Sequence, residues 1–512
     1  MNGKANSQDE VLGFLADPAT HGGPVKRVDT HAAAVFLAGE RVLKVKRAVR
    51  FPFLDYSTIE KRQAACEAEL AVNAPYAPEI YRRVVPITRE ADGRLKVDGS
   101  GAPVEWAVEM QRFDETHTLD HLAGAIDEGL AEALAHAVAT AHARAPAVDA
   151  EPWIAALGSY IDEHAQTFRK HPDIFPPAEI DALARKSLAA YDRAVPLLRE
   201  RARRGLVRRI HGDLHLGNIV LIGGKPVLFD AIEFSKIIAS GDVFYDLAFL
   251  LMDLLERGLP RPANIVLNRY LGETRRLDDL DALAMLPFFL SMRAAIRARV
   301  TAARLEQTPV AEREPIAHAA RGYFAFALRA ITPPAPQFVA VGGLSGTGKS
   351  ELARALAPLL EPMPGAVIVR SDVERKALLG VEETERLPPE GYAADINARV
   401  YASLADKARR ILAAGHSVIV DAVFAKSAER AGIAEIAGSG AIRLKGLFLT
   451  ADLATRLARV GARRPDASDA DAKVAQAQER FDVGAMDWRQ IDASGTPAAT
   501  LAHARAALSR LD

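Results

Sequence analysis

The sequence predicts a two-domain chain, with an α+β domain of a small strand-rich lobe and a larger helical lobe, followed by an α/β domain with a parallel sheet. A length of 512 residues exceeds what one hydrophobic core usually organises. The segment 331–337 holds three prolines within four residues, which cannot continue a helix and favour an extended linker. Strand patterns come first and helical patterns follow, and after the linker a strand leads directly into a glycine-rich turn.

These observations set the expected domain bounds. The first domain should span 1–330, with its small lobe at about 25–115 and its helical lobe at about 116–330. The Pro-rich linker is 331–337, and the second domain is 338–512.

The composition is that of an ordinary globular protein, with 49% hydrophobic and 26% charged residues. A net charge of -1 argues against bulk electrostatic binding to nucleic acid or to a membrane. The first residues lack the apolar core of a secretory signal, and no run of 18 apolar residues occurs. The single cysteine, Cys66, cannot form an internal disulfide. We therefore expect a cytoplasmic enzyme with no membrane partner.

Apolar periodicity predicts the elements of the first domain. Strands are expected at 34–37, 41–46, 82–87 and 104–111. Helices are expected at 57–73, 128–145, 153–168, 180–203 and 316–330. Pro196 should kink or split the helix at 180–203.

A polar loop lies between apolar strands in the stretch Arg209-Ile-His-Gly-Asp-Leu-His-Leu-Gly-Asn-Ile219. A further carboxylate, Asp230, follows Asn218 after a short hairpin pattern. Phosphoryl transfer needs a carboxylate that orients the attacking hydroxyl and takes its proton, together with oxygen ligands that fix Mg²⁺ on the phosphates. Asp213, Asn218 and Asp230 are the residue types that this chemistry requires.

The pattern His-x-Asp-x-x-x-x-Asn followed by Asp resembles the catalytic and metal loops shared by protein kinases and by aminoglycoside or choline phosphotransferases. The resemblance implies a two-lobed kinase-like fold in which Asp213 is the catalytic base. It also implies that Asn218 and Asp230 hold the metal. Residues implied to support the loop and the metal ligand are His211, His215 and Glu233.

An upstream strand, Leu43-Lys44-Val45-Lys46, places both lysines on one face. A lysine there could contact the α- and β-phosphates if a glutamate on the next helix positions it. By position within the family pattern we expect the pair Lys44 and Glu69, with Lys46 and Glu67 as alternatives. The phosphate-covering glycine loop of protein kinases is absent between 29 and 37.

A second motif, Gly343-Leu-Ser-Gly-Thr-Gly-Lys-Ser350, fits the P-loop pattern G-x-x-x-x-G-K-[ST]. A strand at 338–341 precedes it and a helix at 351–360 follows it. Backbone N–H groups of such a turn surround the β-phosphate at the positive end of a helix. Lys349 would add charge, and Ser350 would bind Mg²⁺. The nucleotide-binding residues expected here are Gly343, Ser345, Gly346, Thr347, Gly348, Lys349 and Ser350.

The next predicted strand, 366–369, ends in Arg370-Ser-Asp372-Val-Glu-Arg375. A carboxylate at this end of a strand, beside the P-loop strand, can reach a substrate hydroxyl. Asp372-x-x-Arg375 resembles the base-and-arginine pair of polynucleotide kinases, gluconate-kinase-like enzymes and zeta-toxin-like kinases. The resemblance makes Asp372 a catalytic base and Arg375 a contact of the acceptor or of phosphate, while a helix cap is the alternative role for Asp372.

A third strand, 417–420, ends in Asp421, a candidate Mg²⁺ ligand. A fourth strand is expected at 443–449, and arginines crowd the helix and turn after it. Small P-loop kinases carry a lid at this place, and its arginines neutralise the transferred phosphoryl group. We expect Arg463 and Arg464 in that role, with a solvated basic helix face as the alternative.

Together the motifs predict a Mg²⁺-dependent phosphotransferase that uses ATP (or GTP) at two sites and acts on hydroxyl groups of small-molecule acceptors. The resemblance, to a tandem aminoglycoside-phosphotransferase-like and P-loop ATP-binding protein, covers most of the chain. Three alternatives remain open: one domain is a nucleotide-sensing regulator, the kinase-like fold has lost transfer, or the second domain phosphorylates nucleic-acid 5′-hydroxyls. The near-neutral charge argues against the last.

Overall fold

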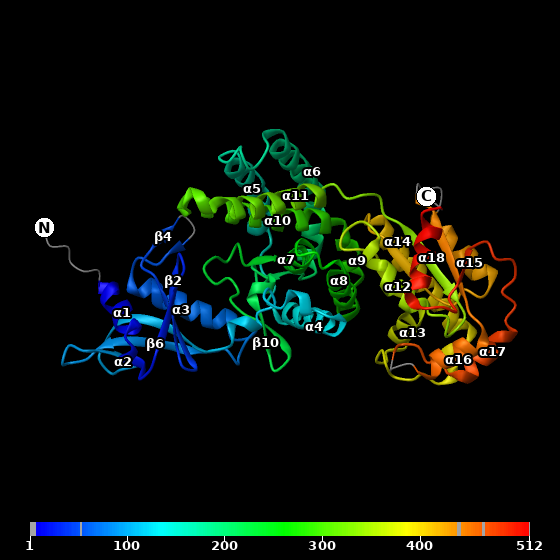
Figure 1. Ribbon diagram of the computed structural model, residues 1–512, viewed down its shortest axis with the longest axis horizontal. Coiled ribbons are helices and arrows are strands. Elements are labelled where there is room, and N and C mark those ends of the chain that lie inside the picture. The colour runs from blue at the N-terminus through cyan, green and yellow to red at the C-terminus, as the bar shows by residue number, and fades with distance from the viewer. Residues whose placement is uncertain (1–6, 52–53, 438–441, 463–465, 511–512) are drawn as a thin grey trace. The chain divides into compact units, whose positions relative to one another are not determined.

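The computed structural model describes residues 7–51, 54–437, 442–462 and 466–510. The chain divides into two compact units (Figure 1). Unit 1 contains Met1–Glu163 and Val195–Asp253, and unit 2 contains His164–Ala194 and Leu254–Asp512. The borders of these units fall within helices of the first predicted domain and do not coincide with the predicted domain bounds. Those bounds therefore stay a prediction. Over the described residues, no helix is both long enough and apolar enough to cross a membrane.

Unit 1 begins with a six-stranded antiparallel sheet in the order β1-β2-β3-β8-β6-β7. Its strands are β1 (Val25–Asp29), β2 (Ala33–Ala38), β3 (Arg41–Lys46), β6 (Tyr81–Arg89), β7 (Leu95–Val97) and β8 (Ala102–Gln111). The four strands predicted from the sequence are confirmed. The edge strands β1 and β7 were not predicted, because neither has a fully buried residue and their alternation is weak.

Helix α3 (Ile59–Asn73) packs on this sheet against β6 and β8. It begins where the Thr58 hydroxyl accepts a hydrogen bond from Lys61 N at 3.4 Å, which satisfies one of the free N–H groups of the first turn. Its buried face carries Cys66 and Glu69 toward the sheet. The apolar face is therefore interrupted by one buried carboxylate, on the side that also holds the lysines of β3.

The rest of unit 1 carries two small antiparallel sheets, β10–β11 and β9–β12. The strands are β9 (Val207–Arg209), β10 (Ile219–Ile222), β11 (Lys225–Leu228) and β12 (Ser240–Asp242). The helices that accompany them are α4 (Glu128–Arg144), part of α5 (Glu151–Phe168), the end of α6 (Pro177–Arg203) and most of α7 (Val243–Glu256). The loop 210–218 connects β9 to β10, which belong to different short sheets. Both of its ends are therefore fixed by strand pairing.

Helix α6 runs as one element through Pro196. Of the kink or split expected from the sequence, the split does not occur. Proline removes one hydrogen bond and crowds the preceding turn. Ala194 and Leu198 are buried on either side of it, and this packing holds the helix together.

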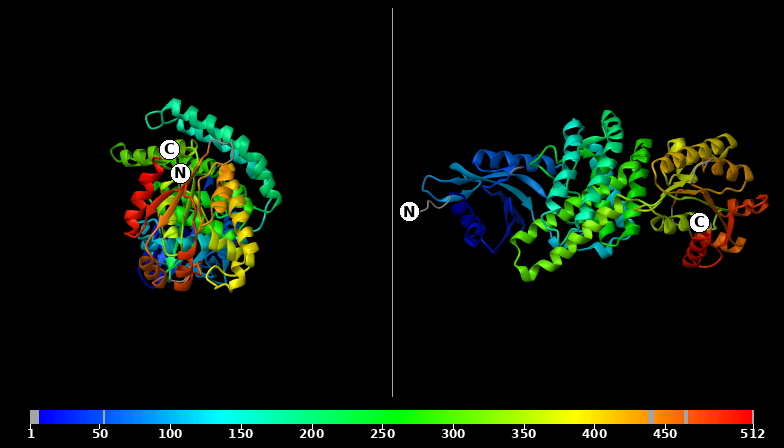
Figure 2. Two further views of the ribbon diagram at one scale, coloured as in Figure 1. Left: turned by 90° about the vertical axis from the view of Figure 1, so that its right-hand side faces the viewer. Right: turned by 90° about the horizontal axis from the view of Figure 1, so that it is seen from above.

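Unit 2 contains a five-stranded parallel sheet in the order β14-β15-β13-β16-β17. Its strands are β13 (Phe338–Gly343), β14 (Val367–Arg370), β15 (Val418–Asp421), β16 (Leu444–Thr450) and β17 (Arg489–Asp492). Figure 2 shows α14 (Ala394–Ala413) and α18 (Pro497–Leu508) on opposite sides of this sheet. The parallel α/β fold predicted for the second domain is thus confirmed.

Helices that precede the linker also belong to unit 2, among them α8 (Pro260–Thr274), α10 (Leu286–Ala303) and α11 (Arg313–Ala330). Two asparagines of α8 bind the edge strand β14. Asn264 Nδ2 and Asn268 Nδ2 both donate to Ala366 O, at 3.0 and 3.1 Å. Ile368 N donates to Asn268 Oδ1 at 2.8 Å. Side-chain amides therefore satisfy backbone groups at the start of the strand that leads to Asp372.

The contribution of a buried ion pair in unit 1 to stability can be tested by mutation. Arg201 Nε lies 2.6 Å from Asp242 Oδ2, and both side chains are 1% exposed or less. Asp242→Asn keeps the shape but removes the carboxylate charge beside the buried Arg201 guanidinium, so we expect a loss of stability of about 3 kcal/mol or more. Urea unfolding followed by circular dichroism measures the change.

Glu151→Gln is the matched control. Glu151 pairs with Arg199 at 2.8 Å, only two residues before Arg201, but both side chains of that pair are more than half exposed. Solvent screens such a pair, and we expect little change in the urea midpoint. Equal shifts for the two variants would contradict the argument.

Candidate active sites

The loop between β9 and β10 brings Asp213 and Asn218 together. Asn218 Nδ2 donates to the Asp213 carbonyl at 2.9 Å and to Asp213 Oδ2 at 3.0 Å. Gly212 adopts φ +85°, a conformation that favours glycine, and a Cβ there would meet the Ile232 side chain at 3.1 Å. The loop therefore has one compact shape in which the candidate base and a candidate metal ligand are adjacent.

Two buried carboxylates of α7 hold the backbone of this loop. Asp246 accepts hydrogen bonds from His211 N and Gly212 N, both at 3.0 Å. Asp253 accepts one from Leu216 N at 2.9 Å. These bonds satisfy N–H groups that the short sheets leave unpaired.

The two histidines of the loop contact its neighbours. His211 Nε2 lies 2.9 Å from Phe229 O, which can only accept, so that nitrogen carries the proton. Burial lowers the pKa of His211 and keeps the ring neutral. His215 Nδ1 accepts from Gly217 N at 3.1 Å, and its Nε2 lies 3.3 Å from Asp213 Oδ2. Both rings thus contact the loop or the segment after β11, and their expected supporting role stays a prediction.

Asp230 follows β11 in a left-handed conformation, φ +60°. Such a conformation is strained for residues other than glycine and persists only when neighbours fix it. Asp230 N donates to Tyr81 Oη at 3.1 Å. The next residue is fixed by buried Asn73, which accepts from Ala231 N at 2.7 Å and donates to Ala231 O at 3.1 Å. The turn thus aims the Asp230 carboxylate at β3.

Lys44 joins that carboxylate to helix α3. Its Nζ lies 2.7 Å from Asp230 Oδ1 and 2.8 Å from Glu69 Oε1. Burial alone would lower the pKa of Lys44, but the charges of Asp230 and Glu69 outweigh it and hold that pKa well above its usual value. Glu67, the alternative partner, is exposed and accepts from Gln63 Nε2 at 2.9 Å.

Lys46 has a different position on the same face of β3. It is 3% exposed and pairs with Glu69 Oε2 at 2.6 Å and with Glu233. Burial would raise the pKa of Glu69, but the two lysines lower it to about 2. The Glu69 carboxylate therefore pairs with both lysines. Lys46 is buried, and Lys44 points toward Asp230. Glu233 contacts Lys46 and the Tyr56 hydroxyl (3.3 Å).

The second site lies in unit 2, where β13 runs through the glycine-rich turn into α12 (Lys349–Leu356). Three glycines of the turn have φ values that favour glycine: Gly343 (+137°), Gly346 (+86°) and Gly348 (+92°). A Cβ on Gly346 would lie 2.6 Å from Arg456 O. The turn is therefore shaped by its own glycines and by the close approach of helix α16 (Leu453–Gly461).

Both backbone groups of Ser345 are held by side chains. Its N–H donates to Gln478 Oε1 at 2.7 Å, and its carbonyl accepts from Arg456 Nε at 2.9 Å. Arg456 is 1% exposed and also donates to Ala475 O at 3.0 Å. Segments that follow β16 thereby fix the first half of the P-loop turn.

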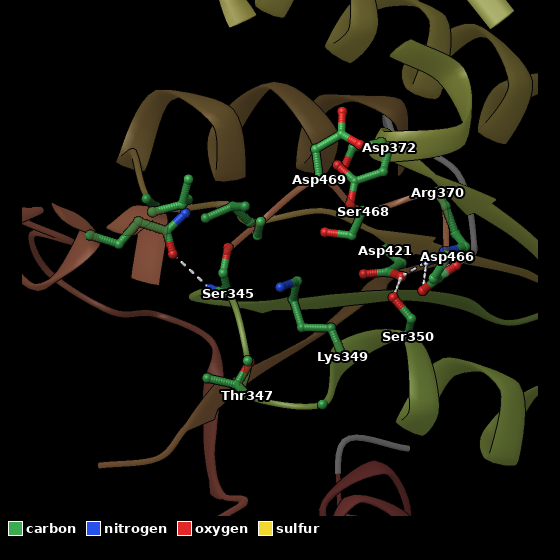
Figure 3. A pocket seen from close by; sticks show the side chains of 18 of the residues that line it. Ser345, Thr347, Lys349, Ser350, Arg370, Asp372, Asp421, Asp466, Ser468 and Asp469 are labelled. Atoms are coloured by element: carbon green, nitrogen blue, oxygen red, sulfur yellow. Dashed lines mark hydrogen bonds and ion pairs between the residues drawn. The ribbon is translucent and has the colours of Figure 1, made fainter. Parts of the chain in front are cut away.

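A polar cluster stands at the carboxyl ends of β13, β14 and β15 (Figure 3). Ser350 Oγ donates to Asp421 Oδ2 at 2.6 Å. Arg370 lies 3.4 Å from the same carboxylate and donates to both oxygens of Asp466, at 3.1 and 3.0 Å. Lys349 Nζ donates to Leu344 O at 3.3 Å. The hydroxyl and the carboxylate expected to bind Mg²⁺ are thus in direct contact.

Asp372 lies in the first turn of α13 (Ser371–Leu379) and borders the same cluster. Arg370 is the N-cap residue of α13 and no side chain caps the helix, so the alternative role of Asp372 as a cap is not observed. Burial and the nearby Asp421 raise the pKa of Asp372, although Lys349 and Arg370 act in the opposite direction. Arg375 follows one turn later, donates to Gly391 O at 2.9 Å and is 6% exposed.

These residues line a cavity of about 1270 Å³. From the expected nucleotide-binding set it includes the P-loop residues from Ser345 to Ser350, together with Asp372, Arg375 and Asp421. Gly343 lies at the end of β13. Arg463 and Arg464 fall outside the described residues, and their expected role stays a prediction.

Several residues that hold these sites were not singled out from the sequence: Asn73, Asp253, Arg456, Gln478 and Asp466. The only available signal was a polar residue within an otherwise apolar helical pattern, as for Asn73 in α3 and Asp253 in α7.

Gly346→Ala tests the shape of the P-loop turn. A Cβ would clash with the backbone of α16 at a φ that alanine rarely adopts, so we expect ATP affinity to fall about tenfold or more. Binding of a fluorescent ATP analogue measures it. Gly432→Ala, in α15 (Ser427–Ala434) with nothing within 4 Å of its Cβ, is the control and should bind as the original protein does. Unchanged affinity in both variants would show that the turn tolerates a side chain.

Two family models match two separate segments of the chain. Residues 33–285 match the phosphotransferase enzyme family, and residues 338–482 match an AAA domain family. Uncharacterized proteins of Mycobacterium tuberculosis and Mycobacterium bovis are 29% identical over 498 residues, which covers 94% of this chain and of each relative.

Three solved structures are similar to parts of the chain. A gluconokinase from Sinorhizobium meliloti 1021 covers 34% of this chain and 93% of its own, with 23% identity and a TM-score of 0.26. A choline/ethanolamine kinase family protein from Mesorhizobium loti covers 64% and 99%, with 16% identity and a TM-score of 0.38. A GDP complex of aminoglycoside 2′-phosphotransferase-IIIa covers 63% and 100%, with 14% identity and a TM-score of 0.39. The chain is thus similar to the phosphotransferase enzyme family in its first matched segment and to an AAA domain family in its second.

Proposed function

We propose that this protein is an ATP- and Mg²⁺-dependent phosphotransferase with two nucleotide sites, one in a domain spanning 1–330 and one in a domain spanning 338–512. Each transfers the γ-phosphoryl group to a hydroxyl of a small-molecule acceptor. The observation that carries the proposal is the contact of Lys44 with Asp230. It brings a phosphate-binding lysine and a metal-binding carboxylate, 186 residues apart, to one point.

In the first site, Asp213 orients the acceptor hydroxyl and takes its proton as the oxygen attacks the γ-phosphorus. The bond from that phosphorus to the β–γ bridging oxygen breaks, and ADP leaves. Lys44 contacts the α- and β-phosphates from β3, and Glu69 fixes its position. GTP could serve in place of ATP with the same contacts.

The donor sets fit Mg²⁺. Asn218 turns its amide nitrogen to Asp213, which leaves the amide oxygen for a cation, and Asp230 supplies a carboxylate. Within the described ranges no group of three or more His, Cys, Asp or Glu forms a metal cluster, and Mg²⁺ typically takes only one or two carboxylates. Asn218 and Asp230 would hold Mg²⁺, which would supply positive charge to offset the negative charge of the phosphates.

In the second site, backbone N–H groups of the P-loop turn and Lys349 hold the phosphates. Ser350 and Asp421, already in contact, would hold the metal. Asp372 takes the proton of the acceptor hydroxyl while the γ-phosphoryl group is transferred, and ADP leaves. Arg463 and Arg464 complete this site as proposed lid residues.

Two variants separate the two sites. Asp213→Asn should lower one phosphoryl transfer about 100-fold or more, and Lys349→Ala should lower the other. A metabolite extract incubated with ATP and Mg²⁺, then analysed by mass spectrometry, reports the phosphorylated products. Asp92→Asn and Lys473→Ala change exposed residues of the same types and serve as controls.

The product pattern also decides between the proposal and the regulatory alternative. The hydrogen bonds of α8 to β14 give that alternative a physical basis, because α8 precedes the linker and β14 leads to Asp372. If the second domain is a sensor, Lys349→Ala changes the rate of the Asp213-dependent product and removes no product of its own. An extract that yields no product with any variant, and no ATP turnover, would contradict the enzyme proposal.

The raised pKa of Asp372 makes turnover at the second site sensitive to acid. The base must be ionised, so the Lys349-dependent rate should fall as pH drops through a pKa above the usual 3.9 or so of aspartate. A pH–rate profile in the Asp213→Asn background measures it. A rate that stays flat until the pH at which an ordinary aspartate titrates would contradict a raised pKa.

Stability should respond with the opposite sign. A carboxyl with a raised folded-state pKa contributes stability below its unfolded-state pKa, and that contribution is lost as pH rises through the folded-state value. Asp372→Asn should therefore stabilise the ligand-free protein at pH 7 and have a smaller effect in acid. Thermal unfolding at both pH values is the measurement.

A further inference from the structure

We propose that the side-chain amide of Gln478 binds the γ-phosphoryl group of the nucleotide in the P-loop site, so that this site distinguishes a nucleoside triphosphate from a diphosphate. This inference rests on the proposed function of the second domain and adds a ligand contact that the P-loop pattern does not include. Three observations carry it: the orientation of the amide, the opening of its nitrogen to the cavity, and the course of the segment that leads to it.

The backbone of Ser345 fixes the orientation of the Gln478 amide. Ser345 N donates to Gln478 Oε1 at 2.7 Å. A backbone N–H can only donate, so the amide oxygen has to face it and the amide nitrogen has to take the opposite side. Both residues are buried, which shields this hydrogen bond from water. The amide is therefore held in one of its two possible orientations.

The nitrogen of this amide opens to the cavity. Gln478 lines the cavity together with the P-loop residues. Among the described residues Gln478 Nε2 has no hydrogen-bond partner, and it is not one of the fully enclosed polar atoms that lack a partner there. Its two N–H groups therefore reach the space of the cavity. A nucleotide that enters the cavity displaces water from these groups and has to supply an acceptor in its place.

The position of Gln478 is fixed from both sides. Gln478 follows α17 (Ala472–Ala477) directly. The buried Arg456 donates to Ala475 O on that helix at 3.0 Å and to Ser345 O at 2.9 Å. One guanidinium thus ties the helix before Gln478 to the same residue whose N–H meets the amide. Because the donor is already held in place, little side-chain entropy is lost when it binds a ligand.

The segment 466–478 runs from the helix of the candidate base to the P-loop turn. At its start Asp469 pairs with Lys376 of α13, the helix that also carries Asp372, at 3.0 Å. At its end the Gln478 amide meets the turn. In the proposed reaction the phosphoryl group passes from the turn to an acceptor at the candidate base. Gln478 therefore lies at the donor end of the path that this group takes.

The place of the amide along the turn indicates which phosphate it binds. In a P-loop the N–H groups at the start of the helix surround the β-phosphate, and the lysine reaches on to the γ-phosphate. Ser345 precedes these groups, and its own N–H is occupied by Gln478. Figure 3 shows Ser345 on one side of Lys349 and the contact of Ser350 with Asp421 on the other. The amide therefore contacts the γ-phosphoryl group on the side away from the proposed metal ligands.

The chemistry of an amide suits this place better than that of a carboxylate. A glutamate could also accept the hydrogen bond from Ser345 N, and as a charged acceptor it would bind that N–H more strongly. It would, however, bring a further negative charge to the phosphates, whereas glutamine offers two N–H donors. The residue type at position 478 thus matches a ligand that is rich in negatively charged oxygens.

Gln478→Glu separates the ligand contact from the support of the turn, because it keeps an acceptor for Ser345 N and loses both N–H donors. Calorimetry of the full chain with Mg²⁺ measures the affinities for ADP and for a non-hydrolysable ATP analogue. The binding that Lys349→Ala removes defines the P-loop site. We expect the affinity of this site for the ATP analogue to fall about tenfold or more, and its affinity for ADP to stay within about twofold.

Gln476→Glu is the matched control. It makes the same change of charge in α17, two positions before Gln478, at an exposed residue that does not line the cavity. Both nucleotide affinities should stay as in the original protein. If Gln478→Glu does not fold, Gln478→Met carries the test. It removes the donors without adding a charge, so the affinity for the ATP analogue should again fall more than the affinity for ADP.

The other outcomes separate this inference from the proposed function. Equal losses for the two nucleotides would show that Gln478 only supports the turn, and unchanged affinities would show that its amide meets no phosphate. Either result overturns the inference and leaves the proposed function of the second domain in place. If the original protein binds no nucleotide in a way that depends on Lys349, the proposed function of that domain fails, and the inference fails with it.

Discussion

Both candidate sites contain buried ion pairs, in which opposite charges compensate each other. In unit 1 the fully buried Glu69 forms ion pairs with Lys44 and Lys46. Lys46, the more buried of the two lysines, also pairs with Glu233. In unit 2 Arg370 is shared between Asp421 and Asp466. Such networks hold their members in one geometry, since any displacement exposes an unpaired charge to a low dielectric.

Side chains of neighbouring elements also hold the irregular loops in shape, through hydrogen bonds to the loop backbone. The loop 210–218 has few strand bonds of its own, and carboxylates of α7 replace them. The P-loop turn receives a comparable support from Arg456 and Gln478. In both units a rigid helix therefore fixes a loop through its backbone, while the loop's own side chains are left to act on a ligand.

Features that depend on residues close together in the chain can be predicted from the sequence. Most contacts between residues far apart in the chain cannot. The fold class follows from periodicity and the P-loop pattern, and the pair Lys44 and Glu69 was expected from the position of both residues within the family pattern. Asn73 acts on Ala231 across 158 residues and Gln478 on Ser345 across 133, and no spacing rule links such pairs. The exposed edge strands β1 and β7 lack the burial that makes a strand visible in sequence.

The amide contacts of α8 also bear on how the chain behaves in a crowded solution. An outermost strand of a parallel sheet offers a row of unpaired N–H and C=O groups to any other extended peptide. Here Asn264 and Asn268 occupy those groups on β14. Helix α8, which precedes the Pro-rich linker, thus covers part of the β14 edge of the five-stranded sheet. A fragment that starts at the linker would lack α8, expose this edge of the sheet and be prone to edge-to-edge self-association.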